Sequence, residues 1–147
     1  MDEIFQVLIS HFKISVTSND ADCIRVFHQL EKRFKTKDSC EESFIYSIRI
    51  KDDLLNNPDS TPRLIKNKNT YIITVHHDKI ITEANCFKQA LWNILQLYAV
   101  FNITYPRKYE KVLGFFHELL FDTGVFFFKE KSTKYIKLLH DINSRLS

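Results

Sequence analysis

The chain has 147 residues, of which 44% are hydrophobic and 27% charged, and these values are typical of one globular domain rather than a disordered protein. Aromatic residues reach 14% while glycine occurs only twice, which predicts a core of large rings and excludes the glycine-rich phosphate loops of nucleotide-binding enzymes. The net charge of +3 combines an acidic segment, residues 1–60, with a basic one, residues 61–147, and the basic segment could meet nucleic acid or the acidic segment of a second copy.

The cysteines and the apolar runs give expectations about location. Cys23, Cys40 and Cys86 form no CxxC pair and have no histidine at zinc-ligand spacing, which favours reduced thiols in an intracellular protein of the cytoplasm or nucleus. The start of the sequence, MDEIFQ, lacks the basic and apolar regions of a signal peptide. The uncharged apolar runs are shorter than the roughly 18 residues of a membrane span, so no membrane contact is expected.

The first part of the chain predicts two strands, a helix and a connection. Residues 2–12 have apolar side chains at four-residue spacing and could form a short helix, but residues 11–17 alternate apolar and polar positions, and a strand is the favoured interpretation there. A helix is expected over residues 20–35 and a second strand over 44–50. Residues 51–70 are rich in turn formers, so they are interpreted as a linker and as the one possible internal boundary.

The next part predicts a hairpin and two helices. Two apolar runs, residues 71–76 and 79–82, flank a polar turn, as in a strand–turn–strand unit. Residues 85–103 are apolar over most of a helical circumference and predict the buried central helix of the fold. Tyr105-Pro106 ends that helix, and Pro106 is expected in the first turn of the next one, whose apolar face is the most regular in the chain: Tyr109, Val112, Leu113, Phe116, Leu119 and Leu120.

The end of the chain predicts a short apolar segment and a last helix. Residues 125–128 are interpreted as a strand or as a connector pressed into the core. A helix is expected to begin at Ser132 or Thr133 and to carry on one side Ile136, Leu139 and Ile142 or Asn143. The predicted fold is therefore a single α+β domain over residues 1–147. Its small, mostly antiparallel sheet packs against the central helix (85–103) and two further C-terminal helices.

No group of residues predicts catalysis, and neither a metal ion nor a cofactor is expected. The adjacent histidines of His76-His77-Asp78 would point to opposite faces of a strand and are interpreted as polar turn residues. His117-Glu118 lacks the second histidine, four positions on, that a zinc-hydrolase helix requires. Cys86 opens the central helix, where the helix dipole could activate a thiol, but no glycine-bearing elbow surrounds it and a small core cysteine is the favoured interpretation.

Two surfaces are candidates for binding. On the central helix, uncharged polar residues fall on one narrow stripe beside Trp92, and an aromatic residue without neighbouring charge is typical of a protein interface. This candidate interface consists of Asn85, Gln89, Trp92, Asn93 and Gln96. A candidate basic patch for nucleic acid consists of Arg63, Lys66, Lys68, Arg107, Lys108 and Lys111. A solvated basic face is the favoured interpretation of this patch, because the chain has no RNP-like segment.

Three stretches carry a family resemblance: residues 61–65 (TPRLI), 71–75 (YIITV) and 97–106 (LYAVFNITYP). With them the chain resembles the C-terminal region of animal proteins often labelled sterile-alpha-motif-domain-containing protein three-like, some of which look transposon-derived. The shared pattern is a pair of short apolar strands, an apolar helix ending in a "YVFNxxYP"-like motif, and a second helix with a "FIQ"-like stretch, here Phe115-Phe116-His117. The resemblance covers about residues 61–147, and no sterile alpha motif is present.

The resemblance implies no catalytic residues, since the group has no established activity, and it favours an interaction domain over an enzyme. The leading hypothesis is a non-enzymatic module for protein–protein interaction or self-assembly, with a mobile-element or viral origin as an open expectation. The alternative hypothesis is a nucleic-acid-binding accessory domain that uses the basic C-terminal half.

Overall fold

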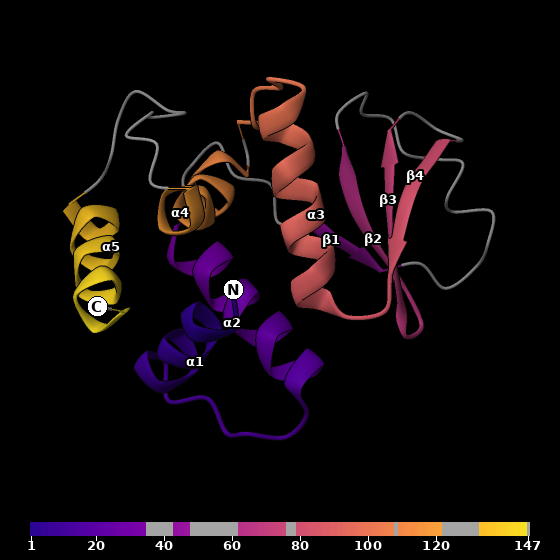
Figure 1. Cartoon of the computed structure of the whole chain (residues 1–147). Coiled ribbons are helices and arrows are strands. Elements are labelled where there is room, and N and C mark those ends of the chain that lie inside the picture. The colour runs from indigo at the N-terminus through magenta and orange to yellow at the C-terminus, as the bar shows by residue number, and fades with distance from the viewer. Residues whose placement is uncertain (35–42, 48–61, 76–78, 108, 122–132, 147) are drawn as a thin grey trace. The chain divides into compact units, whose positions relative to one another are not determined.

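The computed structural model divides into two compact units (Figure 1). A helical unit combines Met1–Ser39 with Tyr105–Ser147, and a sheet unit is formed by Cys40–Thr104. The sheet unit is thus inserted in the sequence between the two parts of the helical unit, while the prediction of a single domain stays a prediction. The structure describes residues 1–34, 43–47, 62–75, 79–107, 109–121 and 133–146.

In its described part, the helical unit consists of α1 (Asp2–His11), α2 (Asn19–Arg33), α4 (Glu110–Phe121) and α5 (Thr133–Leu146). α1 packs against α2 and α5, and α4 packs against the same two helices. α2 confirms the helix predicted over residues 20–35, with Lys32 and Arg33 in its last turn, where cations interact favourably with the helix dipole.

The core of the helical unit is built from aromatic rings. Phe116 of α4 stacks on Phe5 of α1 and on Phe27 of α2, with ring centroids 5.4 Å and 5.9 Å apart. A second set of rings with centroids at most 6.0 Å apart consists of Phe34, Phe115 and Tyr135. Such pairs add about 0.5–1.5 kcal/mol each beyond the area they bury. The core of large rings that the composition predicts is therefore present in this unit.

The strand predicted over residues 11–17 is wrong, because this segment is the end of α1 and the loop that follows it. Lys13 has a positive φ of 54°, its N–H donates to the Ser10 carbonyl at 3.2 Å, and the Ile14 N–H donates to the Ile9 carbonyl at 3.1 Å. This bonding is a Schellman motif, which satisfies the last carbonyls of a helix. The alternating apolar side chains of this segment do not form a buried strand face, since Val16 is 81% exposed.

The sheet unit contains a four-stranded sheet in the order β1 (Ile45–Ser47), β2 (Arg63–Asn67), β3 (Thr70–Val75) and β4 (Lys79–Ala84). β2 pairs with β3, and β3 with β4, in antiparallel fashion, while β1 is parallel to β2. The expected α+β class and the mostly antiparallel sheet are confirmed.

The linker predicted over residues 51–70 is wrong at its C-terminal end, where β2 lies. Leu64 and Ile65 are both buried in the sheet and outweigh the turn-forming composition around them. The turn formers mark only the tight connection from β2 to β3, where Asn67 pairs with Thr70 and Lys68 has a positive φ of 56°. Residues 51–61 of the predicted linker lie outside the described residues.

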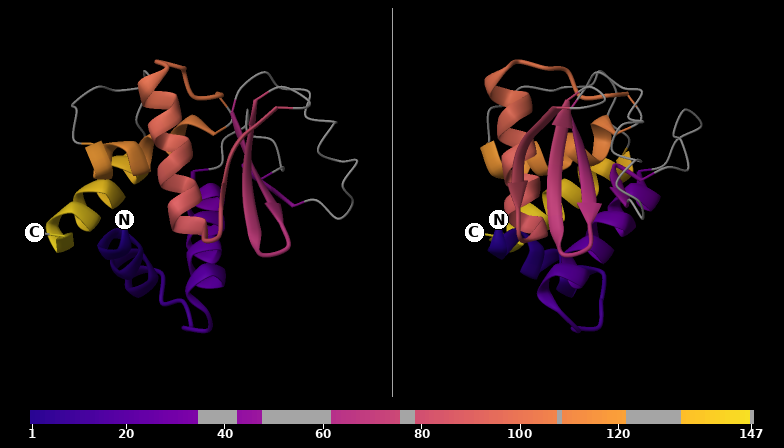
Figure 2. Two further views of the ribbon diagram at one scale, coloured as in Figure 1. Left: turned by 45° about the vertical axis from the view of Figure 1, so that its right-hand side comes forward. Right: turned by 90° about the vertical axis from the view of Figure 1, so that its right-hand side faces the viewer.

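α3 (Phe87–Val100) packs against β2, β3 and β4 of the sheet unit (Figure 2). The hydroxyl of Tyr98 donates to the Pro62 carbonyl at 2.7 Å in the interior, and the rings of Phe87 and Tyr71 have centroids 5.9 Å apart. α3 also ends in a Schellman motif, with Asn102 at a positive φ of 51°. It confirms the predicted helix 85–103 with shorter ends.

The burial of α4 is wider than its one-faced apolar pattern predicts, whereas α3 is buried on one side and carries the predicted polar stripe on the other. α4 has buried residues at every position from Val112 to His117, which is more than one face of a helix. α3 buries one side and exposes Gln89 and Gln96 on the other. Pro106 lies before α4 instead of in its first turn. The difference arises because tertiary contacts decide which sides of a helix are covered.

The predicted face of the last helix is displaced by one position. α5 begins at Thr133 as expected, but its buried residues are Tyr135, Leu138 and Ile142, and Ile136 is 51% exposed. Tyr135 is buried in place of Ile136 because its ring packs against those of Phe34 and Phe115. The apolar segment 125–128 lies outside the described residues.

Candidate functional site

The outer face of α3, the side turned away from the sheet, carries the candidate interface. Asn85, Gln89 and Gln96 are exposed, and Trp92 and Asn93 are half-buried. At about 100° per residue Gln89, Trp92, Asn93 and Gln96 fall on one side of the helix, opposite the buried residues Phe87, Ala90, Leu91, Ile94, Leu95 and Tyr98. Asn85 precedes the helix, so the structure places four of the five predicted residues on one side of α3.

The α3 outer face is uncharged and partly apolar. Gln89 Nε2 donates to Asn93 Oδ1 at 2.8 Å, a bond between successive turns that fixes both amide groups. Lys88, which is half-buried, is the one charged residue of the helix. At its C-terminal end, Val100 is 77% exposed and extends this side of the helix with an apolar side chain. Phe101, the C-cap residue that follows, is 67% exposed.

The candidate basic patch is not assembled within one unit. Lys66 and Lys68 belong to the sheet unit, and Arg107 and Lys111 to the helical unit. Arg63 is only 6% exposed, because it lies on β2 opposite Thr74 of β3. The last member of the patch, Lys108, lies outside the described residues. Neither unit therefore contains all the residues of the candidate basic patch.

The residues weighed for catalysis or metal binding are dispersed. Cys86 is exposed at the N-cap of α3, contrary to the core position predicted for it, because the chain is still extended there, while Cys23 is buried. Cys40 and the His76-His77-Asp78 segment lie outside the described residues. Among the residues that are described, no three His, Cys, Asp or Glu side chains are grouped so that they could hold a metal ion.

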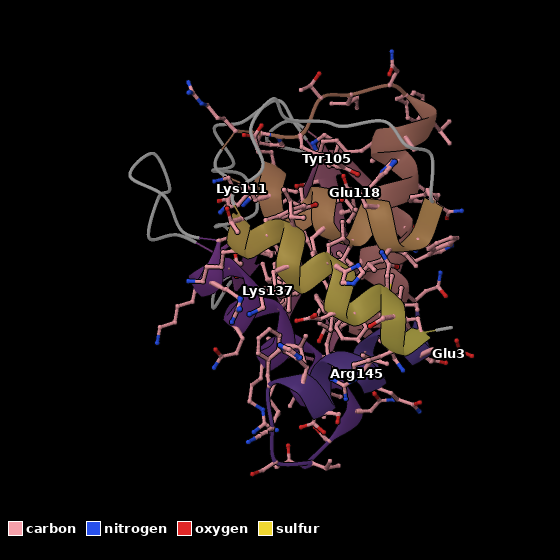
Figure 3. The ribbon with its side chains drawn as sticks, turned by 90° about the vertical axis from the view of Figure 1, so that its left-hand side faces the viewer. Glu3, Tyr105, Lys111, Glu118, Lys137 and Arg145 are labelled. Atoms are coloured by element: carbon pink, nitrogen blue, oxygen red, sulfur yellow. The ribbon has the colours of Figure 1, made fainter. Side chains whose placement is uncertain are left out.

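A buried polar group in the helical unit was missed by sequence reasoning. The Tyr105 hydroxyl lies 2.9 Å from Nδ1 of His117, and the Tyr135 hydroxyl donates to Glu118 Oε2 at 3.0 Å (Figure 3). Burial lowers the pKa of His117, with Glu118 acting in the opposite direction, so the imidazole is neutral near pH 7. Burial, with the Glu118 carboxylate beside it, raises the pKa of Tyr135. These pairs satisfy buried polar atoms, which is a structural role.

A second missed group lies at the start of α2. Both carboxylate oxygens of Asp22 accept the Thr17 N–H at 3.1 Å, and Arg25 forms an ion pair with the same carboxylate. Burial opposes ionisation, but the hydrogen bonds from Thr17 and the charge of Arg25 outweigh it and lower the pKa of Asp22. Asp22 thereby anchors the chain that leads into α2, again a structural role. No periodic pattern distinguishes such an aspartate in the sequence.

None of the helices in the described part of the chain is long and apolar enough to span a membrane. Comparison with known proteins adds no relative: no family model matches the chain, and neither does any curated protein or solved structure. The resemblance to the sterile-alpha-motif-domain-containing protein three-like group therefore stays a prediction.

Proposed function

We propose that the protein is a non-enzymatic self-assembly module, and that two copies associate through the outer faces of their α3 helices. The observation that carries this proposal is the surface itself: a helix face with amide groups, the half-buried Trp92 and the exposed Val100, and without acidic residues. Trp is enriched at the centre of protein interfaces, whereas charged residues are depleted there.

The chemistry of the amide groups supports a second copy as the partner. Each of Gln89, Asn93 and Gln96 presents both a donor and an acceptor, so a surface built from them is complementary to itself. In a two-fold dimer the same patch faces its own copy, and any charge on it would meet a like charge. The α3 outer face avoids that repulsion. A partner recognised by charge would instead require acidic or basic residues, which this face lacks.

The dimer can be tested by adding like charges to the interface. Gln89→Lys with Gln96→Lys would place four lysines together across the two-fold axis, and we expect self-association to weaken by about tenfold or more. Light scattering and sedimentation over a range of protein concentrations measure it. We expect the average mass of the unchanged protein to rise with concentration and that of the double variant to stay at the monomer value.

A matched control uses the same substitution on the helical unit. Gln6 of α1 and Gln29 of α2 are exposed glutamines, so Gln6→Lys with Gln29→Lys adds the same charge elsewhere. This control should associate as the unchanged protein does. A strict monomer at every concentration, or an equal loss of association in the control, would contradict the proposal.

A further inference from the structure

Three basic side chains from three different helices converge in the helical unit. His11, Arg33 and Arg145 lie in the last turns of α1, α2 and α5. Arg145 Nη2 donates to the Ser10 hydroxyl at 3.1 Å, which joins α5 to the last turn of α1, where His11 follows Ser10 in the chain. Arg145 is labelled in Figure 3. α1 also packs against α2, whose C-terminal turn carries Arg33.

The positive charges of this cluster act on one another. Burial lowers the pKa of His11, and the charges of Arg145 and Arg33 lower it further, while Asp141 of α5 partly opposes them. Like charges held this close favour the neutral imidazole. Among the described residues, the charged groups that act on His11 are thus Arg145, Arg33 and Asp141, a set with a positive excess.

The arginines are not neutralised by the surrounding described residues. Within the described ranges, neither Arg33 nor Arg145 has a carboxylate within salt-bridge distance, and Arg145 bonds to an uncharged hydroxyl instead. The dipole of each helix favours a cation at its C-terminal end, which accounts for each basic residue by itself. It does not account for the unfavourable effect that the charges of Arg145 and Arg33 have on the imidazolium of His11.

We propose that these three side chains and the Ser10 hydroxyl form a binding site for the phosphate group of a small phosphomonoester. Such a group carries nearly two negative charges at neutral pH and several acceptor oxygens. Guanidinium groups match its geometry with paired N–H donors. All four side chains are exposed or half-buried, so the site is open to a ligand. This site lies in the helical unit and does not depend on the proposed self-assembly through α3.

The test is an NMR titration of the His11 imidazole in the full chain, with inorganic phosphate as the probe. A bound dianion favours the imidazolium, so phosphate should raise the pKa of His11, and by reciprocity phosphate should bind more tightly as the pH falls. A sodium chloride sample at the same ionic strength separates binding from screening. If chloride shifts the His11 titration as far as phosphate does, the site is overturned.

Variants test the assignment of the residues. Arg33→Gln and Arg145→Gln should each weaken phosphate binding by about tenfold, the effect of losing a hydrogen bond to a charged group. Arg145→Lys should recover part of the loss, because it restores the charge without the paired donors. The matched control is Lys134→Gln, an exposed cation on the same helix, which should bind phosphate unchanged.

Two further outcomes would overturn the proposal. The first is an equal loss of phosphate binding in Lys134→Gln, which would indicate a diffuse charge effect. The second is binding of a short single-stranded oligonucleotide without terminal phosphates, with no response to inorganic phosphate; that result would assign the cluster to a nucleic-acid backbone. A two-dimensional amide spectrum of each variant shows whether it is folded, so loss of structure cannot be mistaken for loss of binding.

Discussion

The residues that sequence reasoning missed are buried polar side chains. His117 and Tyr105 are twelve positions apart, and Tyr135 and Glu118 are seventeen, so no local pattern links either pair. Each pair forms only when the helices pack, because the partner of a buried polar atom is chosen by the fold. The sequence predicts the apolar neighbours of these residues through their spacing, yet it cannot predict which histidine is buried with them.

A pH dependence of stability follows from His117. The pKa of His117 in the folded chain lies below the ordinary value of 6.5. As the pH falls past 6.5, the imidazole is therefore protonated in the unfolded chain before it is protonated in the folded chain. The free energy of unfolding should therefore decrease as the pH falls below about 6.5. Denaturant unfolding at several pH values measures this slope, and His117→Gln, which keeps an acceptor for Tyr105, should make it shallower.

The pKa of His11 is also lowered, so His11 is expected to contribute to the same pH dependence of stability. The variant His11→Gln serves as a comparison for His117→Gln. His11→Gln should remove a separate part of the pH dependence, and the variant with both substitutions should be the flattest of the set. An unchanged slope in His117→Gln would show that folding does not lower the pKa of His117, contrary to the expected direction.

At the scale of elements, the sequence predicts the helices and strands whose apolar residues repeat over many positions or whose ends are marked by turn formers or proline. The helices α2, α3 and α4 and the strands β3 and β4 are found near their expected places. The strand expected at residues 11–17 rested on a short alternation, and this segment is the end of α1 and the loop that follows it. The linker expected at 51–70 rested on composition, and its residues 63–67 form β2. Residues 2–11 form the helix α1 because Ile4, Phe5 and Leu8 lie on one side of a helix and are buried there.

The end of α1 allows a test of backbone strain. Lys13 has a positive φ, a conformation that costs a residue with a Cβ about 1–2 kcal/mol and costs glycine almost nothing. Lys13→Gly should therefore unfold with a free energy about 1 kcal/mol higher than Lys13→Ala, a control that removes the same charge. Urea denaturation of the two variants gives the difference. Equal stability, or a more stable alanine variant, would show that the strain is absent.

At the scale of the whole molecule, the two candidate sites differ in how far the sequence predicts them. The α3 outer face lies on a single helix, so Gln89, Trp92, Asn93 and Gln96 can be assigned to one side of it from their spacing alone. The cluster of His11, Arg33 and Arg145 draws on three helices, and its members are as much as 134 positions apart. The packing of α1 against α2 and α5 brings such residues together, and no periodic pattern in the sequence predicts that packing.

The insertion of the sheet unit into the helical unit sets an order of events during synthesis. α1 leaves the ribosome more than a hundred residues before α5, against which it packs, a delay on the order of 10 s at ordinary rates of translation. Residues 40–104 are contiguous, so their sheet can pair in the meantime.

This order predicts that a chain ending at residue 121 protects the amides of β2 and β3 from hydrogen exchange but leaves α1 unprotected, since α5 is missing. Protection of α1 in that shortened chain would contradict the prediction. Until α5 arrives, the apolar face of α1 lacks one of the helices that cover it, and we expect this is the interval in which the nascent protein depends most on chaperones.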